Sequence, residues 1–344
     1  MNWWQILIVV IATIIFFYLA FAIIIVFLAN SKLFLKRGYD PDNDLYIKYE
    51  DCPDLNRSEY YTYYKKAKIN GFIYTSNLYK EEYKGFIILS HGLWGSHIQY
   101  LLDIEFLTSL GYKVLAFDNY GVGLSEGENQ ISLANSIYVL NQVIDDVKKR
   151  NINENLDLLL YGHSMGGYAV SCALKKHQEI KSAIIRSAPL SASVAGRDLL
   201  MLNNKTLAYF LYPVITLSTK LLLGRRNDES SKKMILKNKK TSILIFHAKN
   251  DQIVFYKHSL AYKLLRCKKD NIKIYINEKG RHNSILTEKS QDNYSLLKKE
   301  YKELLKENDN QKIHSFISNV KENKRMYYSL NDEVTSKIKD FLKK

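Results

Sequence analysis

The sequence predicts an α/β fold in which a mostly parallel, twisted sheet carries helices on both faces. From residue 85 onward, short apolar segments alternate with helix-prone segments, which is typical of parallel strands joined by crossover helices. A long uncharged segment precedes this region and predicts one membrane-spanning helix. About 310 residues follow that segment, enough for a single large core.

Two early strands are expected at 60–64 and 69–74, joined by a turn. The expected strands of the alternating region lie at 84–90, 112–118, 156–161, 183–187, 241–248 and 271–276.

The segment 162–167, Gly-His-Ser-Met-Gly-Gly, lies between an apolar strand and a helix-prone stretch, which is the context of a nucleophile elbow. A free serine hydroxyl is a poor nucleophile, so the chemistry requires a tight turn that presents Oγ outward between small neighbours. Gly162 and Gly166 are the small residues on either side of Ser164. Because an ordinary glycine-rich turn shows the same pattern, the interpretation depends on the surrounding motifs.

The strand at 84–90 ends in the loop 91–96, His-Gly-Leu-Trp-Gly-Ser. Backbone N–H groups at such a position can hold the negative charge that develops on a carbonyl oxygen, together with the N–H after the nucleophile. Leu93 and Met165 are therefore the candidate oxyanion-hole residues, through their main chains. A simple His-Gly turn is the alternative interpretation of this loop.

The glycine-rich loop 119–127 follows the strand at 112–118. Its glycines could surround a phosphate, but the spacing matches neither a Walker motif nor a dinucleotide-binding fingerprint. We expect a structural loop near the site.

In this order, His91-Gly92, the segment 117–127 and the segment 162–167 resemble the signature of the α/β-hydrolase superfamily. The greatest likeness is to the branch of serine aminopeptidase-type, monoacylglycerol lipase and lysophospholipase-like proteins, and it spans about residues 70 to 285. That family often has Arg-Gly or His-Gly after the aspartate, whereas this chain has Asn119-Tyr120-Gly121.

The resemblance implies a catalytic triad in the chain order Ser, Asp or Glu, His. The segment 249–254 resembles the family's acid loop, with Asp251 in the acid position, and 280–283 resembles its histidine loop. His282 would take the Ser164 proton as general base, and Asp251 would fix the tautomer of His282 and stabilise its imidazolium form.

Other ionisable residues are expected to have structural or solvated roles. Asp228, Asp270 and Glu278 lie in charged segments, where solvated carboxylates are expected. His163 is the variable residue of the elbow, and His247 lies near the end of a strand, where a hydrogen-bonded core role is expected.

No metal site and no cofactor are expected. The chain has no His-Glu-x-x-His motif, and its three cysteines are isolated rather than paired as Cys-x-x-Cys. Cys172, on the elbow helix, is expected to be a buried apolar residue. Triad chemistry itself requires no cofactor.

The segment from Trp3 to Ala29 contains no charged residue and exceeds the roughly 30 Å thickness of a bilayer's hydrocarbon core. A cleaved signal peptide would have a basic start and a shorter apolar core, so residues 1–30 are predicted to be a retained single-pass anchor. Lys32, Lys36 and Arg37 favour the cytoplasmic face for the following domain, although large domains can translocate despite such charges.

The net charge of +15 lies outside the anchor. A basic surface near a bilayer would attract anionic headgroups, and nucleotide bias in the genome explains the lysine content equally well. Nucleic acid is not an expected partner, because the lysines are scattered among acidic residues and no nucleic-acid-binding signature is present.

The predicted organisation is an anchor, a linker and one hydrolase domain. The linker covers 31–58 and the hydrolase domain 59–344. A helical cap or lid is expected within 190–240, where apolar residues either pack on the core or line an acyl pocket. The charged stretch 288–328 is expected to form one or two surface helices before a closing helix, and no function follows from it.

Taken with the anchor, the resemblance implies a membrane-anchored serine hydrolase that cleaves lipid-like or medium-chain acyl esters, such as a lysophospholipid or monoacylglycerol, through an acyl-enzyme on Ser164. A serine peptidase or aminopeptidase of the same fold stays open, as does a non-catalytic anchored binding protein. A strongly acidic pocket for a free amino terminus would indicate an aminopeptidase.

Overall fold

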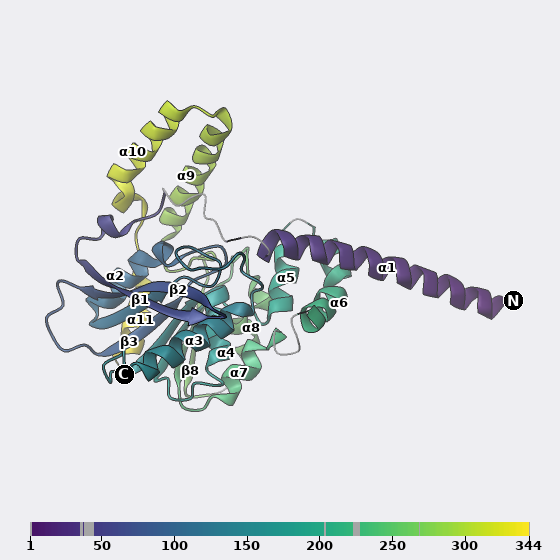
Figure 1. The fold of residues 1–344 in the computed structure, drawn as a ribbon, viewed down its shortest axis with the longest axis horizontal. Helices are drawn as coiled ribbons and strands as arrows, with labels where there is room; N and C mark the ends of the chain where they lie inside the picture. The colour runs from purple at the N-terminus through teal and green to yellow at the C-terminus, as the bar shows by residue number, and fades with distance from the viewer. Residues whose placement is uncertain are drawn as a thin grey trace.

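The computed structural model describes residues 2–34, 37, 45–202, 204–222, 228–267 and 269–343. Eight strands form one sheet in the order β1-β2-β4-β3-β5-β6-β7-β8 (Figure 1). β2 pairs antiparallel with both β1 and β4, and all other neighbours are parallel, which confirms the predicted α/β fold. The strands are β1 (Leu55–Tyr64), β2 (Ala67–Ser76), β3 (Gly85–Ser90), β4 (Tyr112–Phe117), β5 (Leu158–His163), β6 (Ser182–Arg186), β7 (Ser242–Ala248) and β8 (Ile272–Asn277).

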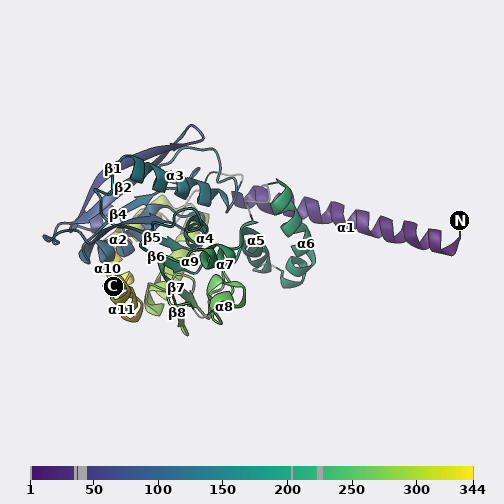
Figure 2. The same cartoon turned by 90° about the horizontal axis from the view of Figure 1, so that it is seen from below.

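Helices cover both faces of the sheet (Figures 1 and 2). In β3, Phe86 and Ile88 pack into the layer that contains α3, α4, α7 and α8, whereas Ile87 and Leu89 pack into the layer of α2 and α11. All six residues of β3 are buried, as expected for a central strand covered on both faces. The helices are α1 (Trp3–Phe34), α2 (Leu101–Ser109), α3 (Asn135–Lys149), α4 (Met165–Ala173), α5 (Ala192–Met201), α6 (Lys205–Leu222), α7 (Ser231–Lys237), α8 (Leu260–Leu264), α9 (Glu288–Glu307), α10 (Asn310–Tyr327) and α11 (Asp332–Leu342), with 3-10 helices at η2 (Tyr49–Asp51), η3 (His97–Tyr100) and η5 (Tyr256–His258).

The carboxyl ends of the parallel strands carry the loops that form the site. Strands β3, β5, β7 and β8 run in the same direction, so the residues that follow them meet at one edge of the sheet. Ligands of open α/β sheets bind at this edge. The predicted site residues lie on loops that leave it, except Met165, which is the first residue of α4.

Helix α1 projects from the rest of the molecule, with the amino terminus at its far end (Figure 2). Among the described residues it is the one helix long and apolar enough to cross a membrane, a property shared by anchors and signal sequences. Its carboxyl-terminal part packs on α6, where Ala22 and Val26 are buried with Leu211 and Val214. The Tyr18 hydroxyl also donates a hydrogen bond of 2.7 Å to the Phe210 carbonyl oxygen.

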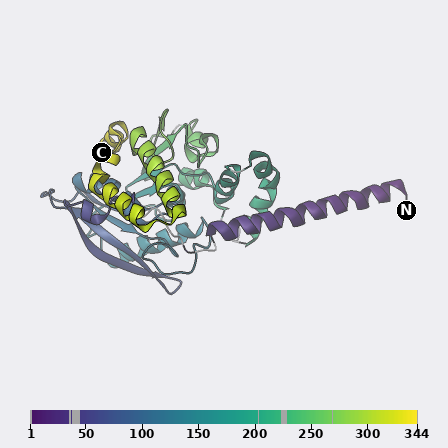
Figure 3. The same ribbon diagram turned by 90° about the horizontal axis from the view of Figure 1, so that it is seen from above.

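Helices α9 and α10 occupy the charged stretch and lie side by side as a hairpin on the body of the molecule (Figure 3). Their contact buries Leu297 and Val320 together with Leu45. At the base of the hairpin, the buried Lys324 forms an ion pair of 3.1 Å with Asp51. The hairpin is therefore fixed to the segment that precedes the sheet.

Parts of the predicted linker and cap lie outside the described residues, namely 35, 36, 38–44, 203 and 223–227. The described end of the linker segment is packed rather than exposed, since Leu45, Ile47 and Cys52 are buried. Helix α1 continues to Phe34, four residues beyond the expected end of the anchor.

The packing of α6 on α1 predicts different costs for two substitutions on the same helix. Val214 is 4% exposed and faces α1, whereas Leu217 is 50% exposed. Val214→Ser should destabilise the full chain in detergent by about 1 to 3 kcal/mol, because it removes buried methyl groups and buries a hydroxyl. The thermal midpoint should fall by several degrees, and Leu217→Ser should change it by much less. Equal midpoints for the two variants would contradict the packing of α6 on α1.

Candidate active site

Ser164 lies at a sharp turn between β5 and α4. Its backbone has φ 56° and ψ −116°, a combination that is strained for a residue with a side chain. The turn brings backbone segments too close for larger neighbours, because a Cβ on Gly166 would lie 1.9 Å from the Ser90 carbonyl oxygen. A Cβ on Gly162 would lie 2.4 Å from the Gly166 oxygen. The geometry is that of a nucleophile elbow.

The loop after β3 lies directly beside Ser164. A Cβ built on Gly92 would be 3.5 Å from the Cβ of Ser164. The N–H groups of Leu93 and Met165 donate hydrogen bonds to no other residue in the described part of the chain. Both amides are therefore available to an incoming carbonyl oxygen, as an oxyanion hole requires.

Asp251 and His282 form a close pair on the loops after β7 and β8. His282 Nδ1 lies 2.8 Å from Asp251 Oδ2 and 3.0 Å from Oδ1. The carboxylate also accepts the N–H groups of Ile253 and Val254, each at 2.9 Å. Burial raises the pKa of Asp251, but the charge and hydrogen bond of His282 and the backbone donor outweigh it, so the pKa stays below its ordinary value. An ionised Asp251 leaves His282 Nε2 as the atom free to accept a proton.

Four of the five predicted site residues line one cavity of about 750 Å³, namely Leu93, Ser164, Met165 and His282. Asp251 lies behind His282, and its side chain is fully buried. The structure therefore brings all five together.

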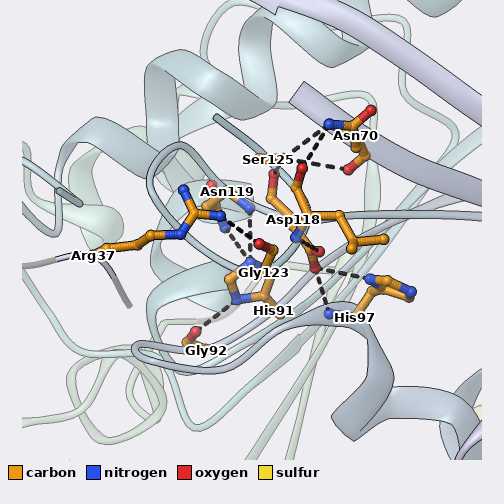
Figure 4. Close-up of polar contacts among 10 residues, drawn as sticks. Arg37, Asn70, His91, Gly92, His97, Asp118, Asn119, Gly123 and Ser125 are labelled. Carbon is orange, nitrogen blue, oxygen red and sulfur yellow. Dashed lines mark hydrogen bonds and ion pairs between the residues drawn. The ribbon is translucent and has the colours of Figure 1, made fainter. Parts of the chain in front are cut away.

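Polar contacts hold the loop after β3, residues 91–96, in place (Figure 4). We call this segment the oxyanion loop, because it carries the candidate donor Leu93. The Asn119 N–H donates to Nε2 of His91 at 2.9 Å. The proton of this buried ring must then be on Nδ1, which lies 2.7 Å from the Gly92 carbonyl oxygen. His91 therefore joins the loop after β4 to the loop that carries Leu93.

The carboxylate of Asp118 organises the same region. It accepts the backbone N–H and Nδ1 of His97, each at 2.8 Å, and the Leu124 N–H at 2.8 Å. Arg37 donates to the Gly123 carbonyl oxygen at 2.5 Å (Figure 4). It also donates to the Gly127 carbonyl oxygen at 3.1 Å, and so joins the segment after α1 to this loop. The glycine-rich loop thus has the structural role that its sequence predicts.

A second buried chain of hydrogen bonds connects the oxyanion loop to the His282 loop. The Gly92 N–H donates to the Tyr100 hydroxyl at 2.9 Å, so this hydroxyl donates its own proton to His163 Nδ1 at 2.8 Å. His163 Nε2 then carries the other proton and donates to the His282 carbonyl oxygen at 3.0 Å. Burial, then the charge of Arg186, lowers the pKa of His163 well below its ordinary value, which keeps the ring neutral as this chain requires.

Arg186 supports the His282 loop from below. It is fully buried and contacts Asp103 and the Tyr161 hydroxyl, and its Nη2 donates to Asn283 Oδ1 at 2.6 Å. Tyr100 and Arg186 were not among the predicted site residues. His163 is part of the elbow motif, but its hydrogen-bond partners Tyr100 and His282 lie 63 and 119 residues away in the chain. No local pattern in the sequence indicates these pairings.

The structure corrects one expectation about the competing residues. Asp228 is not a solvated charge, since it accepts the backbone N–H and the hydroxyl of Ser193 at 2.9 and 2.8 Å at the start of α5. His247 has the expected core role, because its Nε2 donates to the Val254 carbonyl oxygen at 2.9 Å. Cys172 is buried, also as expected. Among the described residues, no group of three or more His, Cys, Asp or Glu side chains could hold a metal ion.

The model of the serine aminopeptidase S33 family, Hydrolase_4, matches residues 81–239, which include the oxyanion loop, the elbow and helices α5 and α6. Esterase Pf2001 of Pyrococcus furiosus has the same fold in two crystal forms, with TM-scores of 0.50 and 0.51. The chain has the α/β-hydrolase fold.

The likeness of this chain to the two esterase structures is one of fold, at 19% and 18% sequence identity. The two superpositions cover 71% and 72% of this chain, and 87% and 88% of the respective esterase chains. The proline iminopeptidase of Saccharolobus solfataricus is 29% identical over 128 residues, which are 36% of this chain and 36% of the iminopeptidase. The match thus spans about a third of that relative's length.

The Asp251–His282 pair predicts a large effect of Asp251→Asn on the reactivity of Ser164. The amide cannot stabilise an imidazolium, so labelling of Ser164 by a fluorophosphonate should slow by about a thousandfold or more. Glu278→Gln is the matched control, because Glu278 lies exposed in an ion pair with Lys249. Equal labelling rates for the wild type and Asp251→Asn would contradict the pairing.

The buried histidines predict acid sensitivity. Burial lowers the pKa of His91, His163 and His247, so below a pH of about 6.5 the unfolded chain binds protons that the folded chain does not. The free energy of unfolding should therefore fall as the pH drops from about 7 to 5. His163→Asn should reduce this slope, and substitution of the exposed His314 should not. Chemical denaturation at several pH values measures both, and an unchanged slope in His163→Asn would contradict the neutral state of the ring.

Proposed function

We propose that this protein is a serine hydrolase that cleaves carboxylic esters through an acyl-enzyme on Ser164. One observation carries the proposal, namely the meeting of three features at a single cavity. These are a serine on a strained elbow, a histidine paired through Nδ1 with a buried carboxylate, and two backbone N–H groups without partners in the described chain.

In the first half-reaction, Ser164 Oγ attacks the ester carbonyl carbon while its proton passes to Nε2 of His282. The N–H groups of Leu93 and Met165 stabilise the resulting oxyanion. When the tetrahedral intermediate collapses, the bond to the leaving alcohol breaks, and that alcohol takes the proton from His282. The acyl group remains on Ser164.

In the second half-reaction, water gives a proton to His282 and attacks the acyl carbon. Collapse of this intermediate returns the proton to Ser164 Oγ and releases the carboxylic acid. Asp251 stays ionised throughout and stabilises the imidazolium form of His282.

The charges around the cavity favour an ester over a substrate with a free amino terminus. Among the described residues that line the cavity, Asp103 is the one carboxylate, and the buried Arg186 pairs with it. Lys32 and Arg281 also line the cavity. A cationic amine would find no uncompensated negative charge there, which an aminopeptidase would need.

The apolar wall of the cavity favours a lipid-like acyl group. Ala29 and Leu33 contribute to it from the end of α1, and Leu199, Leu200 and Leu202 contribute from α5 and the residue after it. Alkyl chains bind in cavities of this kind because apolar surface leaves water. The wall also supports a retained anchor, since cleavage of α1 would remove part of it and expose the apolar face of α6.

We further propose that α1 anchors the enzyme in a bilayer, with the catalytic domain on the cytoplasmic face. The uncharged length of α1 and its mostly exposed side chains support the anchor. The basic residues Lys32 and Arg37 after the apolar segment favour this orientation under the positive-inside rule.

The proposal is tested with the full chain in detergent, using a fluorophosphonate probe and p-nitrophenyl esters of increasing acyl length. Wild-type protein should be labelled and should turn over esters, with a preference for medium or long acyl chains. Ser164→Ala should abolish labelling and lower kcat by about 10⁴-fold or more, with an unchanged thermal midpoint.

Amino-acid amides run in parallel test the peptidase alternative, which the serine aminopeptidase family model and the iminopeptidase relative favour. Amide turnover without ester turnover would replace the ester proposal with a peptidase. A folded protein that is neither labelled nor active on either class would indicate a binding protein that retains the fold.

A further inference from the structure

Two chemically different sets of residues from different elements line the cavity that contains Ser164, and we call them its apolar end and its polar end. One end is formed by α1, α5 and the residue after α5, and its side chains are mainly apolar. The other end is formed by the charged insertion and the segment before the sheet, which contribute Tyr46, Gln291, Tyr294 and Ser295. In Figure 1, α9 lies apart from α5 and from the carboxyl-terminal end of α1.

We propose that α9, together with Tyr46, forms the alcohol subsite of this enzyme, and that the subsite binds a neutral, hydroxyl-bearing alcohol. The acyl chain of the same ester then lies at the other end, against α1 and α5. The inference rests on the proposed esterase function and assigns a role to the insertion, which lies outside the residues 81–239 that match the family model.

The polar end is built from ordered groups. The hydroxyls of Tyr46 and Tyr294 lie 2.6 Å apart, and their rings stack at 5.5 Å between centroids. Gln291 is 8% exposed, and its Nε2 donates to the Leu286 carbonyl oxygen at 3.1 Å. Its Oε1 accepts no hydrogen bond from a described residue, so it is available to a substrate hydroxyl.

The charges at this end are compensated. Arg281 pairs with Asp292 at 2.7 Å, and the carboxylate of Asp103 pairs with Arg186. A polar surface without net charge suits a hydroxylated alcohol such as a glycerol unit. A phosphate would instead need an uncompensated cation at this end.

The positions of the apolar and polar ends are consistent with an ester substrate that enters the cavity from a bilayer. The apolar end includes Ala29 and Leu33, which continue the membrane-length helix, whereas the α9–α10 hairpin lies away from the projecting part of α1 (Figures 1 and 3). An ester that enters beside α1 with its alcohol leading would place that alcohol against α9 and leave its acyl chain toward the bilayer.

The test uses Gln291→Leu and Tyr294→Phe in the full chain in detergent. Each removes a polar group and keeps most of the side-chain volume. The substrates are monodecanoylglycerol and methyl decanoate, which share an acyl chain and differ in the alcohol. We expect kcat/KM for the glycerol ester to fall about tenfold, mainly through KM, and kcat/KM for the methyl ester to change less than about twofold.

Leu296→Ala is the matched control, since Leu296 lies on α9, is 66% exposed and does not line the cavity. Thermal midpoints show whether each variant is folded, and the acyl-length profile with methyl esters should be the same in all of them. Equal losses on both decanoate esters, or a changed acyl-length profile, would overturn the alcohol subsite.

A third substrate separates neutral from charged alcohols. The inference fails if the wild type has a higher kcat/KM for decanoyl lysophosphatidylcholine than for the glycerol ester, and Gln291→Leu lowers both values by the same factor. The subsite would then not be one for a neutral alcohol. A wild type that hydrolyses the methyl ester without any selectivity for glycerol would overturn only this inference. A wild type that hydrolyses no ester would overturn the proposed function itself.

Discussion

The close approach of α4 to the end of β3 is the constraint on which the site depends. Gly166 lies against the Ser90 carbonyl, where even a methyl group would overlap backbone atoms. This contact holds the elbow in the strained conformation at Ser164 and brings the N–H of Met165 next to the loop that carries Leu93. The buried parallel strands on either side supply the packing energy that offsets the strain.

The loops around the elbow are fixed by two buried chains of hydrogen bonds. One runs from Asn119 through His91 to the Gly92 carbonyl oxygen, and the other from the Gly92 N–H through Tyr100 and His163 to the His282 carbonyl oxygen. Each bond contributes only about 0.5 to 1.5 kcal/mol, but a buried group left without a partner costs more. The protons in both chains have one consistent arrangement, so the oxyanion loop and the His282 loop are positioned together.

The sequence predicts the fold and the candidate triad because both depend on local patterns. Short apolar runs mark the strands, and Ser164, Asp251 and His282 lie in recognisable loops after them. The supporting contacts could not be predicted in this way, since Tyr100 and His163 are 63 residues apart and no local signal pairs them. The packing of α1 on α6 and the placement of the charged insertion beside the cavity likewise depend on tertiary structure. The expectation that Asp228 is solvated was wrong, because its charged sequence neighbours do not show that it lies beside the first turn of α5 in the folded protein.

The central claim is that an ester's acyl group is transferred to Ser164 before water releases it. Rapid-quench mass spectrometry of the full chain, mixed with a long-chain p-nitrophenyl ester at neutral pH and quenched in acid within milliseconds, tests this claim most directly. The account predicts a burst of p-nitrophenol matched by an equal amount of acyl group on the peptide that contains Ser164. Turnover with no acyl group on that peptide, or with the acyl group on another residue, would contradict it.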